Sequence, residues 1–202
     1  MKAKVLIIAL LAVMAVGVQN ASAKKVRKVR AFEVEIGGGI VTPTDKLKFD
    51  KNKLGWNAQV ELRYNFKHLP LDLGLHVDGA LLSREGKTIQ DAGIGSVEDI
   101  KSVNFASMTG LAVVDFNLRR AKNFSIFVGC GVGYGMLIND IEKISEIGDI
   151  DKLGCFCVMP RVGVELFHHL RATLYYKNLK TEQSHFGVNL GVVFGGGKKK
   201  VK

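Results

Sequence analysis

Charged side chains stand at every second position in several segments of this chain, with apolar residues between them. This spacing puts the charges on one face of a β-strand. Acids and bases that meet in a narrow interior should pair, because an unpaired buried charge is costly. We therefore predict a network of ion pairs, with a small conduction path or a proton-linked site as the alternative. The predicted set is Glu33, Glu35, Glu61, Arg63, Asp72, His76, Asp78, Asp115, Arg161, Glu165, Arg171 and Lys177.

Residues that could do covalent chemistry do not combine into a site. A hydrolase needs a nucleophile, a base and a group that orients the base. Ser184 and His185 are the best candidates, but adjacent residues of a strand point to opposite faces. His168 and His169 fall in a short turn, and the chain has neither a G-x-S-x-G nor an H-E-x-x-H motif. We expect no enzymatic activity and no cofactor.

The three cysteines, Cys130, Cys155 and Cys157, are predicted to be packing residues. An odd number gives no complete disulfide framework. Cys155 and Cys157 would share one face of a strand, where a disulfide would be strained. Two thiolates without a nearby pair of histidines are a weak sign of a metal site, and we predict none.

The first 23 residues have the organisation of a secretory signal peptide. A basic start at Lys2 and Lys4 precedes an apolar run that ends at Val18, and Ala21 and Ala23 form a small-x-small cleavage site. The run is shorter than the roughly 20 residues that span a bilayer. We predict cleavage after Ala23, and no later segment has the length of a membrane helix.

The net charge of +10 is concentrated at the two ends of the chain. Residues 24–30 form a basic lead-in, and residues 196–202 form a basic tail. Eleven of the 29 basic residues lie outside residues 31–197, which leaves 18 bases against all 19 acids there. This near-neutral body argues against a nucleic-acid partner. We interpret the ends as solvated tails, with weak contact to anionic lipid as the alternative.

Eight segments alternate between apolar and polar residues, most clearly residues 56–66. An apolar face meets a core in a soluble sheet, or lipid in an outer-membrane barrel whose polar face lines the lumen. Pro160 indicates a local break in one strand, and the untidy first half of residues 102–118 suggests a bulge. The predicted strands are residues 32–40, 56–66, 71–81, 102–118, 124–138, 156–166, 170–177 and 186–194.

The connections between these strands differ in length. Long connections at residues 43–51, 84–101 and 139–154 alternate with short ones, and only the short link before the last strand departs from the rule. Short periplasmic turns and long external loops are typical of bacterial outer-membrane barrels, which would put both termini in the periplasm. Four glycines on one face of residues 124–138 would make room for long side chains inside the barrel.

The last strand carries a recognisable pattern. A polar residue and Gly187 are followed by alternating apolar residues, Leu190 and Val192, and the strand ends on the aromatic Phe194. With the signal peptide and the eight strands, this pattern resembles the small OmpX-like and OmpA-transmembrane-domain-like barrels. It is especially similar to the "outer membrane protein beta-barrel domain" or porin-like proteins of Bacteroidetes. The resemblance implies that the barrel-assembly machinery reads this last strand.

Together these patterns predict an all-β fold, an eight-stranded antiparallel up-and-down transmembrane barrel over residues 31–195. It would lie in the outer membrane of a Gram-negative bacterium as a monomer in contact with lipid. We expect a structural or surface-interaction role, in which the three long connections meet an external ligand. A narrow channel or carrier for a small solute, and a soluble lipocalin-like carrier, are alternatives. A wide porin would need about 16 strands.

Overall fold

The computed structural model describes most of the predicted barrel. Ala21, Ala23 and the two predicted basic segments, apart from Arg30, lie outside the described residues. In the part of the chain that is described, no helix has the length and apolar character needed to cross a bilayer. The described residues are 30–44, 51–52, 54–66, 69–91, 96–118, 123–139, 152–179 and 184–195.

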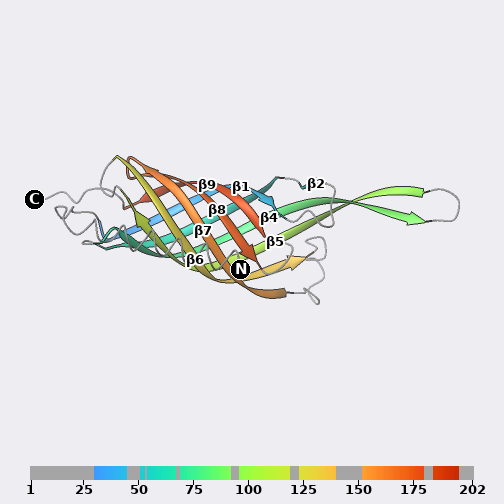
Figure 1. The fold of residues 1–202 in the computed structure, drawn as a ribbon, viewed down its shortest axis with the longest axis horizontal. Helices are drawn as coiled ribbons and strands as arrows, with labels where there is room; N and C mark the ends of the chain where they lie inside the picture. The colour runs from blue at the N-terminus through green and yellow to red at the C-terminus, as the bar shows by residue number, and fades with distance from the viewer. Residues whose placement is uncertain are drawn as a thin grey trace, which may run out of the picture.

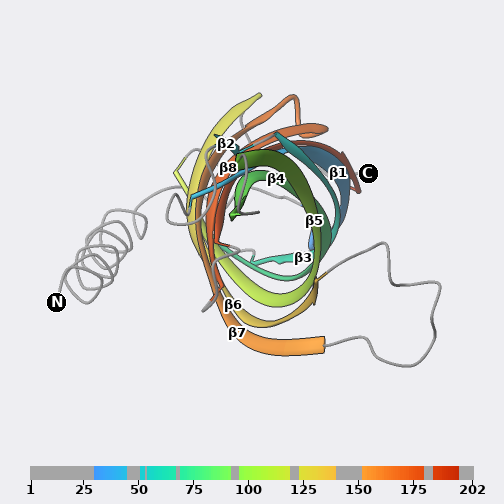
Figure 2. The same cartoon turned by 90° about the vertical axis from the view of Figure 1, so that its right-hand side faces the viewer.

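The described residues form one antiparallel sheet that closes on itself (Figures 1 and 2). Each long strand pairs with the next one along the chain, and β1 pairs with β9. The eight long strands therefore make an up-and-down barrel, which confirms the predicted fold. The strands are β1 (Phe32–Pro43), β2 (Lys51–Asn52), β3 (Gly55–Asn65), β4 (Leu71–Asp91), β5 (Ser96–Asn117), β6 (Phe124–Asn139), β7 (Lys152–Leu166), β8 (Leu170–Leu179) and β9 (His185–Phe194).

Alternation along β3 shows which way the barrel faces. Glu61 and Arg63 are 1% and 2% exposed, whereas Trp56 and Leu62 on the other face are 72% and 53% exposed. The polar face therefore lines the interior and the apolar face forms the outer wall. A lipocalin-like carrier would show the reverse arrangement.

The predicted loop at residues 84–101 is wrong, because β4 and β5 continue through most of it. Their pairing is unbroken from Leu71 opposite Phe116 to Asp91 opposite Ser96, and the expected bulge in β5 is absent from this pairing. We call residues 83–91 and 96–104 the projecting hairpin, since they extend beyond the barrel wall (Figure 1). Residues 84–101 are rich in glycine and charge and do not alternate as the strands of the barrel wall do, so alternation could not predict their pairing.

The other two predicted loops are shorter than expected, because neighbouring strands extend into their ends. Pro43 ends β1, and Lys51 begins β2, which adds to the edge of β4. Asn139 ends β6, and Lys152 begins β7. Residues 45–50 and 140–151 lie outside the described residues.

Pro160 interrupts the ladder between β7 and β8, as its sequence position indicated. The pairs formed by Val158 with Asn178 and by Arg161 with Tyr175 flank two positions at which no pairing is present. Proline has no N–H to donate. Loss of the single ladder bond to the Tyr176 carbonyl accounts for both missing pairs. On its other side Pro160 still pairs with β6.

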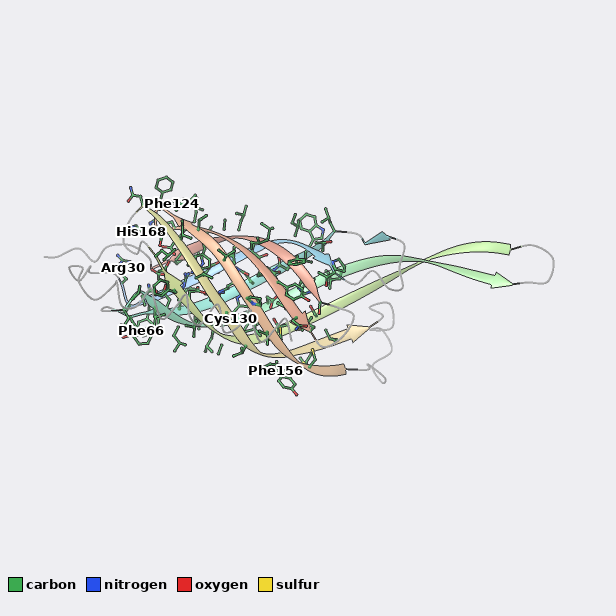
Figure 3. All side chains as sticks on the ribbon, in the orientation of Figure 1. Arg30, Phe66, Phe124, Cys130, Phe156 and His168 are labelled. Atoms are coloured by element: carbon green, nitrogen blue, oxygen red, sulfur yellow. The ribbon has the colours of Figure 1, made fainter. Side chains whose placement is uncertain are left out.

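The two ends of the barrel differ. The strands that are joined by short connections, β3 with β4, β5 with β6 and β7 with β8, meet these connections at the same end of the barrel, which we call the turn end; the opposite end is the hairpin end. Arg30, Phe66, Phe124 and His168 gather at the turn end (Figure 3). The β7–β8 turn is tight enough to hold Phe167 and His168 at positive φ, 53° and 62°.

Candidate functional site

The barrel interior brings the twelve predicted polar side chains together. Each of them is at most 8% exposed. They come from six of the eight long strands, β1, β3, β4, β5, β7 and β8, whereas β6 and β9 contribute none of them. Their burial follows from the strand alternation, which turns each of them inward.

Arg161 on β7 is the centre of this network. Its Nε and Nη2 donate to the two carboxylate oxygens of Asp115 at 2.8 Å each. Its Nη1 and Nη2 donate to Glu61 at 2.5 and 2.9 Å. One guanidinium thus makes two bidentate contacts, the strongest kind of charge-assisted hydrogen bond, and joins β7 to β5 and β3.

Arg171 on β8 extends the network on its other side. It donates to Asp115, and its Nε lies 3.6 Å from a Glu35 carboxylate oxygen. Its guanidinium carbon sits 3.5 Å from the centre of the Phe127 ring. Arginine stacks on an aromatic face while its edge remains free to pair with carboxylates, so Phe127 fixes the plane in which Arg171 reaches Asp115.

Arg63 on β3 collects the remaining acids near the turn end. Its Nη2 donates to Glu35 at 3.2 Å. Its nitrogens also lie 3.7 Å from Glu33, 3.7 Å from Glu61 and 3.6 Å from Glu165. We call these three arginines and their carboxylates the arginine cluster; its members are Arg63, Arg161, Arg171, Glu33, Glu35, Glu61, Asp115 and Glu165.

A second group lies nearer the hairpin end. Lys177 donates to Asp78 and, at 3.0 Å, to Thr109, which itself donates to Asp78. His76 connects this group with the arginine cluster, since its Nδ1 lies 3.0 Å from Glu61 and its Nε2 lies 3.6 Å from Asp78. The charged interior is therefore one continuous network.

Asp72, the last member of the predicted set, lies close to the turn end. It accepts a hydrogen bond from Asn117, which in turn accepts one from Ser125 at 3.0 Å. Asp72 is thus held by an amide.

Inward amides complete the network, although we assigned them no role from the sequence. Gln59 donates to Glu35 at 2.9 Å and accepts from Asn189. Asn57 donates to the Tyr175 hydroxyl at 2.9 Å. The same alternation that selected the charges also places these amides inside, so extending the rule to uncharged polar residues would have found them.

The inward side chains toward the hairpin end are mostly apolar, which we did not predict, although Ser107 and His185 are buried among them. On β4 the inward side chains change from Asp78 to Ala80 and Leu82, and on β8 they change from Lys177 to Leu179. Both faces of the strands are apolar here, so alternation fades and the sequence signal is lost. We call these buried residues the apolar cap; its members are Val41, Ala80, Leu82, Leu111, Val113, Leu137, Cys155, Cys157, Met159, Tyr175 and Leu179.

The remaining residues singled out in the sequence are separated. Cys155 and Cys157 lie in the cap, Cys130 lies half-buried on the outer wall, and all three are free thiols. Ser184 donates to the Leu179 carbonyl at 2.7 Å, whereas the His185 ring faces inward against Tyr175. On the closing strand β9, the strand-end pattern is split between the two faces. Gly187 faces inward, and Leu190, Val192 and Phe194 face outward.

Glycine makes room for the ion pairs, as Gly129 on β6 illustrates. It lies directly between Asp115 on β5 and Arg161 on β7. A methyl group at this position would overlap the Asp115 carboxylate. Because Gly129 has no side chain, the Arg161 guanidinium can reach the Asp115 carboxylate across β6.

We expect Gly129→Ala to lower the free energy of unfolding by about 1–3 kcal/mol, the usual cost of overpacking. The matched control is Gly110→Ala on the outer face of β5, where no atom lies within 4 Å of the added carbon. Urea unfolding in lipid vesicles, followed by fluorescence of the single tryptophan Trp56, measures both. Equal stability of the two variants would show that the Asp115–Arg161 ion pair does not need the space that Gly129 leaves.

Comparisons with known proteins address the whole barrel. The family model described as "Outer membrane protein beta-barrel domain" matches residues 8–197. Neisserial surface protein A (NspA) matches with a TM-score of 0.53 and 12% identity over 83% of this chain and 98% of its own. Ail, the attachment invasion locus protein of Yersinia pestis, in complex with the heparin analogue sucrose octasulfate, matches with a TM-score of 0.40 and 16% identity over 83% and 99%. No curated protein matches the chain.

Proposed function

Because the chain belongs to the outer membrane protein beta-barrel domain family, we propose that it is a non-enzymatic outer-membrane barrel that offers a projecting hairpin to an external partner. The observation that carries this proposal is the long β4–β5 ribbon on a barrel whose interior is filled. The barrel is the rigid support, and the hairpin is the part that is free to meet a ligand.

The outer wall supports contact with lipid. Leu73, Leu75 and Val77 are 47%, 62% and 54% exposed on consecutive outward positions of β4. Soluble monomers rarely expose large continuous apolar surfaces. At the turn end, Phe32 and Phe66 both make edge contacts with Tyr64, with ring centres 5.1 and 5.2 Å apart, an arrangement suited to a membrane interface.

The difference between the two ends supports an orientation. Short turns face the periplasm and long connections face outward in barrels of this class. The turn end, with Arg30 and Gly195, would then be periplasmic, and the hairpin would lie outside the cell. Export by the predicted signal peptide and recognition of β9 by the barrel-assembly machinery are parts of the same proposal.

The hairpin is long enough to reach well past the membrane surface. Its pairing runs from Ser83 opposite Asn104 to Asp91 opposite Ser96. At about 3.3 Å per residue, these nine positions on each strand extend about 30 Å. We expect a partner that lies beyond the lipid head groups.

The strand edges indicate how such a partner binds. A free edge presents unpaired N–H and C=O groups to an incoming strand. At the base of the hairpin, β2 already uses the β4 edge, where Lys51 pairs with Glu85 and Asn52 pairs with Arg84. On the other edge, β5 pairs with β6 only from Phe105 onward in the described part of the chain. The partner we propose is therefore an extended peptide segment added as a further strand.

A variant without the hairpin tests this proposal. Leu82 lies opposite Phe105, so a two-residue Asn-Gly turn can replace Ser83–Asn104 and leave the barrel register intact. Peptides selected by phage display against the intact barrel in lipid nanodiscs serve as the probe. We expect the trimmed variant to bind them at least tenfold more weakly, and methylation of alternate peptide amides to remove binding. Equal binding by the trimmed variant would contradict the proposal.

A further inference from the structure

We propose that Lys177 and Asp78 form a covalent amide cross-link inside the barrel once the chain has folded. The bond joins Nζ of Lys177 to Cγ of Asp78, and one water molecule is released. This goes beyond the proposed function, which requires only a closed barrel that supports a hairpin. It holds or fails independently of any external partner.

The two reacting groups face each other in the interior. Lys177 Nζ donates a hydrogen bond to Asp78 Oδ2, and the two side chains are 0% and 1% exposed. Thr109 contacts both groups, since it accepts a hydrogen bond from Lys177 Nζ at 3.0 Å and donates one to Asp78 Oδ1. A nucleophile that is held against its target in this way reacts as if it were present at very high concentration.

Lys177 differs chemically from the other bases of the network. It is the only lysine among the buried residues that the structure describes. An arginine stays protonated, but a lysine can lose a proton and then has a nucleophilic lone pair. Its inward neighbours on β8, Tyr175 and Leu179, belong to the apolar cap, and apolar surroundings disfavour charged groups. Transfer of a proton along the hydrogen bond from Nζ to Oδ2 of Asp78 gives an amine and a carboxylic acid in contact.

His76 lies where a proton carrier is needed. Its Nε2 is 3.6 Å from Asp78 Oδ1, and its Nδ1 is 3.0 Å from Glu61 Oε2. Glu61 is held in turn by Arg161 at 2.5 and 2.9 Å, so the imidazole has a fixed partner. Because a carboxylate only accepts hydrogen bonds, Glu61 favours a proton on Nδ1 of the imidazole. Nε2 is then the nitrogen that can take up and release a proton.

The reaction balances without any further reagent. After the first proton transfer, the lone pair of Lys177 Nζ attacks Cγ of Asp78, and the carbonyl electron pair moves to Oδ1, where the Thr109 hydroxyl stabilises the negative charge. His76 Nε2 takes a proton from Nζ and returns it to the Oδ2 hydroxyl. The Cγ–Oδ2 bond then breaks, its electron pair leaves with Oδ2 as water, and the electron pair on Oδ1 restores the carbonyl of the amide.

The cross-link connects opposite walls of the barrel. The path around the sheet from β4 to β8 takes four pairings in either direction, through β3, β1 and β9 or through β5, β6 and β7. Replacing a buried ion pair by neutral groups is often stabilising. The bond therefore removes two buried charges and ties β4, the strand that continues into the projecting hairpin, to the far wall.

Tryptic digestion of the wild-type protein from the outer-membrane fraction, followed by tandem mass spectrometry, is the first test. Trypsin does not cleave after a lysine whose amine is part of an amide. We expect a branched fragment in which residues 68–84 are joined to residues 172–180, with a mass one water lower than the sum of the two pieces. Recovery of linear fragments alone, with cleavage after Lys177, overturns the proposal. This measurement needs no variant, so it does not depend on the folding of one.

Lys177→Arg is the matched variant, because arginine keeps the positive charge but has no primary amine. Its intact mass should exceed that of wild type by the difference between arginine and lysine plus one water. Leu174→Ala, on the outer wall of β8 and 50% exposed in wild type, should keep the cross-link. A mass difference that equals the residue replacement alone overturns the proposal.

Folding of the full-length protein from urea into lipid vesicles separates the bond from the fold. Trp56 fluorescence follows folding, and intact mass follows the bond. We expect the unfolded chain to have its full mass and the loss of water to come after folding. His76→Gln should form the bond roughly a hundredfold more slowly, the lower end of the contribution of a positioned acid–base group. Loss of water in the unfolded chain, or equal rates in wild type and His76→Gln, contradicts the proposed reaction.

Discussion

Replacing Arg161 with methionine should lower the free energy of unfolding by about 3–5 kcal/mol, the cost of removing one partner from a buried ion pair. Arg161 makes bidentate contacts with both Glu61 and Asp115, which are each 1% exposed. Without the guanidinium, two carboxylates face each other in a space from which water is largely excluded. Urea unfolding in lipid vesicles, followed by Trp56 fluorescence, measures the loss.

Two companion variants separate charge from packing at this site. Adding Glu61→Gln and Asp115→Asn to Arg161→Met removes the two carboxylates that have lost this arginine and should recover part of the lost stability. The recovery should be incomplete, because Arg171 and Arg63 then lose a carboxylate partner. Arg161→Lys keeps the charge but not the planar fork, so it should fall between wild type and Arg161→Met. A loss below about 1 kcal/mol for Arg161→Met, the value typical of an exposed ion pair, would show that the centre of the network is solvated.

Leu75→Arg should lower the free energy of unfolding by about 2–4 kcal/mol, the cost of a base on the lipid face of a barrel near the bilayer midplane. Leu75 is 62% exposed in the middle of the barrel portion of β4. An arginine at so exposed a position would be almost neutral if the wall faced water. The variant therefore tells a lipid-facing wall from a water-facing one by the same unfolding measurement.

The depth dependence of this cost provides the control. Leu81 lies on the same face of β4, opposite Trp56, and is 54% exposed. Near the interface the cost of a base falls to about 0–1 kcal/mol, so Leu81→Arg should be much milder than Leu75→Arg. If both substitutions are neutral, the outer wall does not contact lipid.

Strand alternation made the barrel predictable from the sequence. Along β3 each polar residue from Asn57 to Asn65 lies inside, and each residue from Trp56 to Tyr64 on the other parity lies outside. A period of two needs no knowledge of neighbouring strands, so it placed the charged residues inside before any pairing was known. Pro160 was predictable for a similar reason, because the missing N–H is a property of the residue itself.

Other features depend on neighbours and could not be predicted in this way. The two carboxylates that Arg161 contacts are fixed by the register and closure of the barrel, since Glu61 and Asp115 lie 100 and 46 residues away in the sequence. The buried residues of the apolar cap could not be predicted from alternation, because apolar residues such as Leu81 and Leu82 occupy both faces of one strand. The pairing within the projecting hairpin could not be predicted either, because residues 84–101 show no alternation of apolar and polar residues.

Electrophoresis of the outer-membrane fraction in SDS, with boiled and unboiled samples side by side, tests whether the protein is a closed transmembrane barrel. A closed transmembrane barrel held by continuous pairing and buried ion pairs should resist SDS until it is boiled. We expect the protein in this fraction, with an unboiled band that migrates faster than its boiled band. A protein recovered in the soluble periplasmic fraction, with the same mobility before and after boiling, would contradict it.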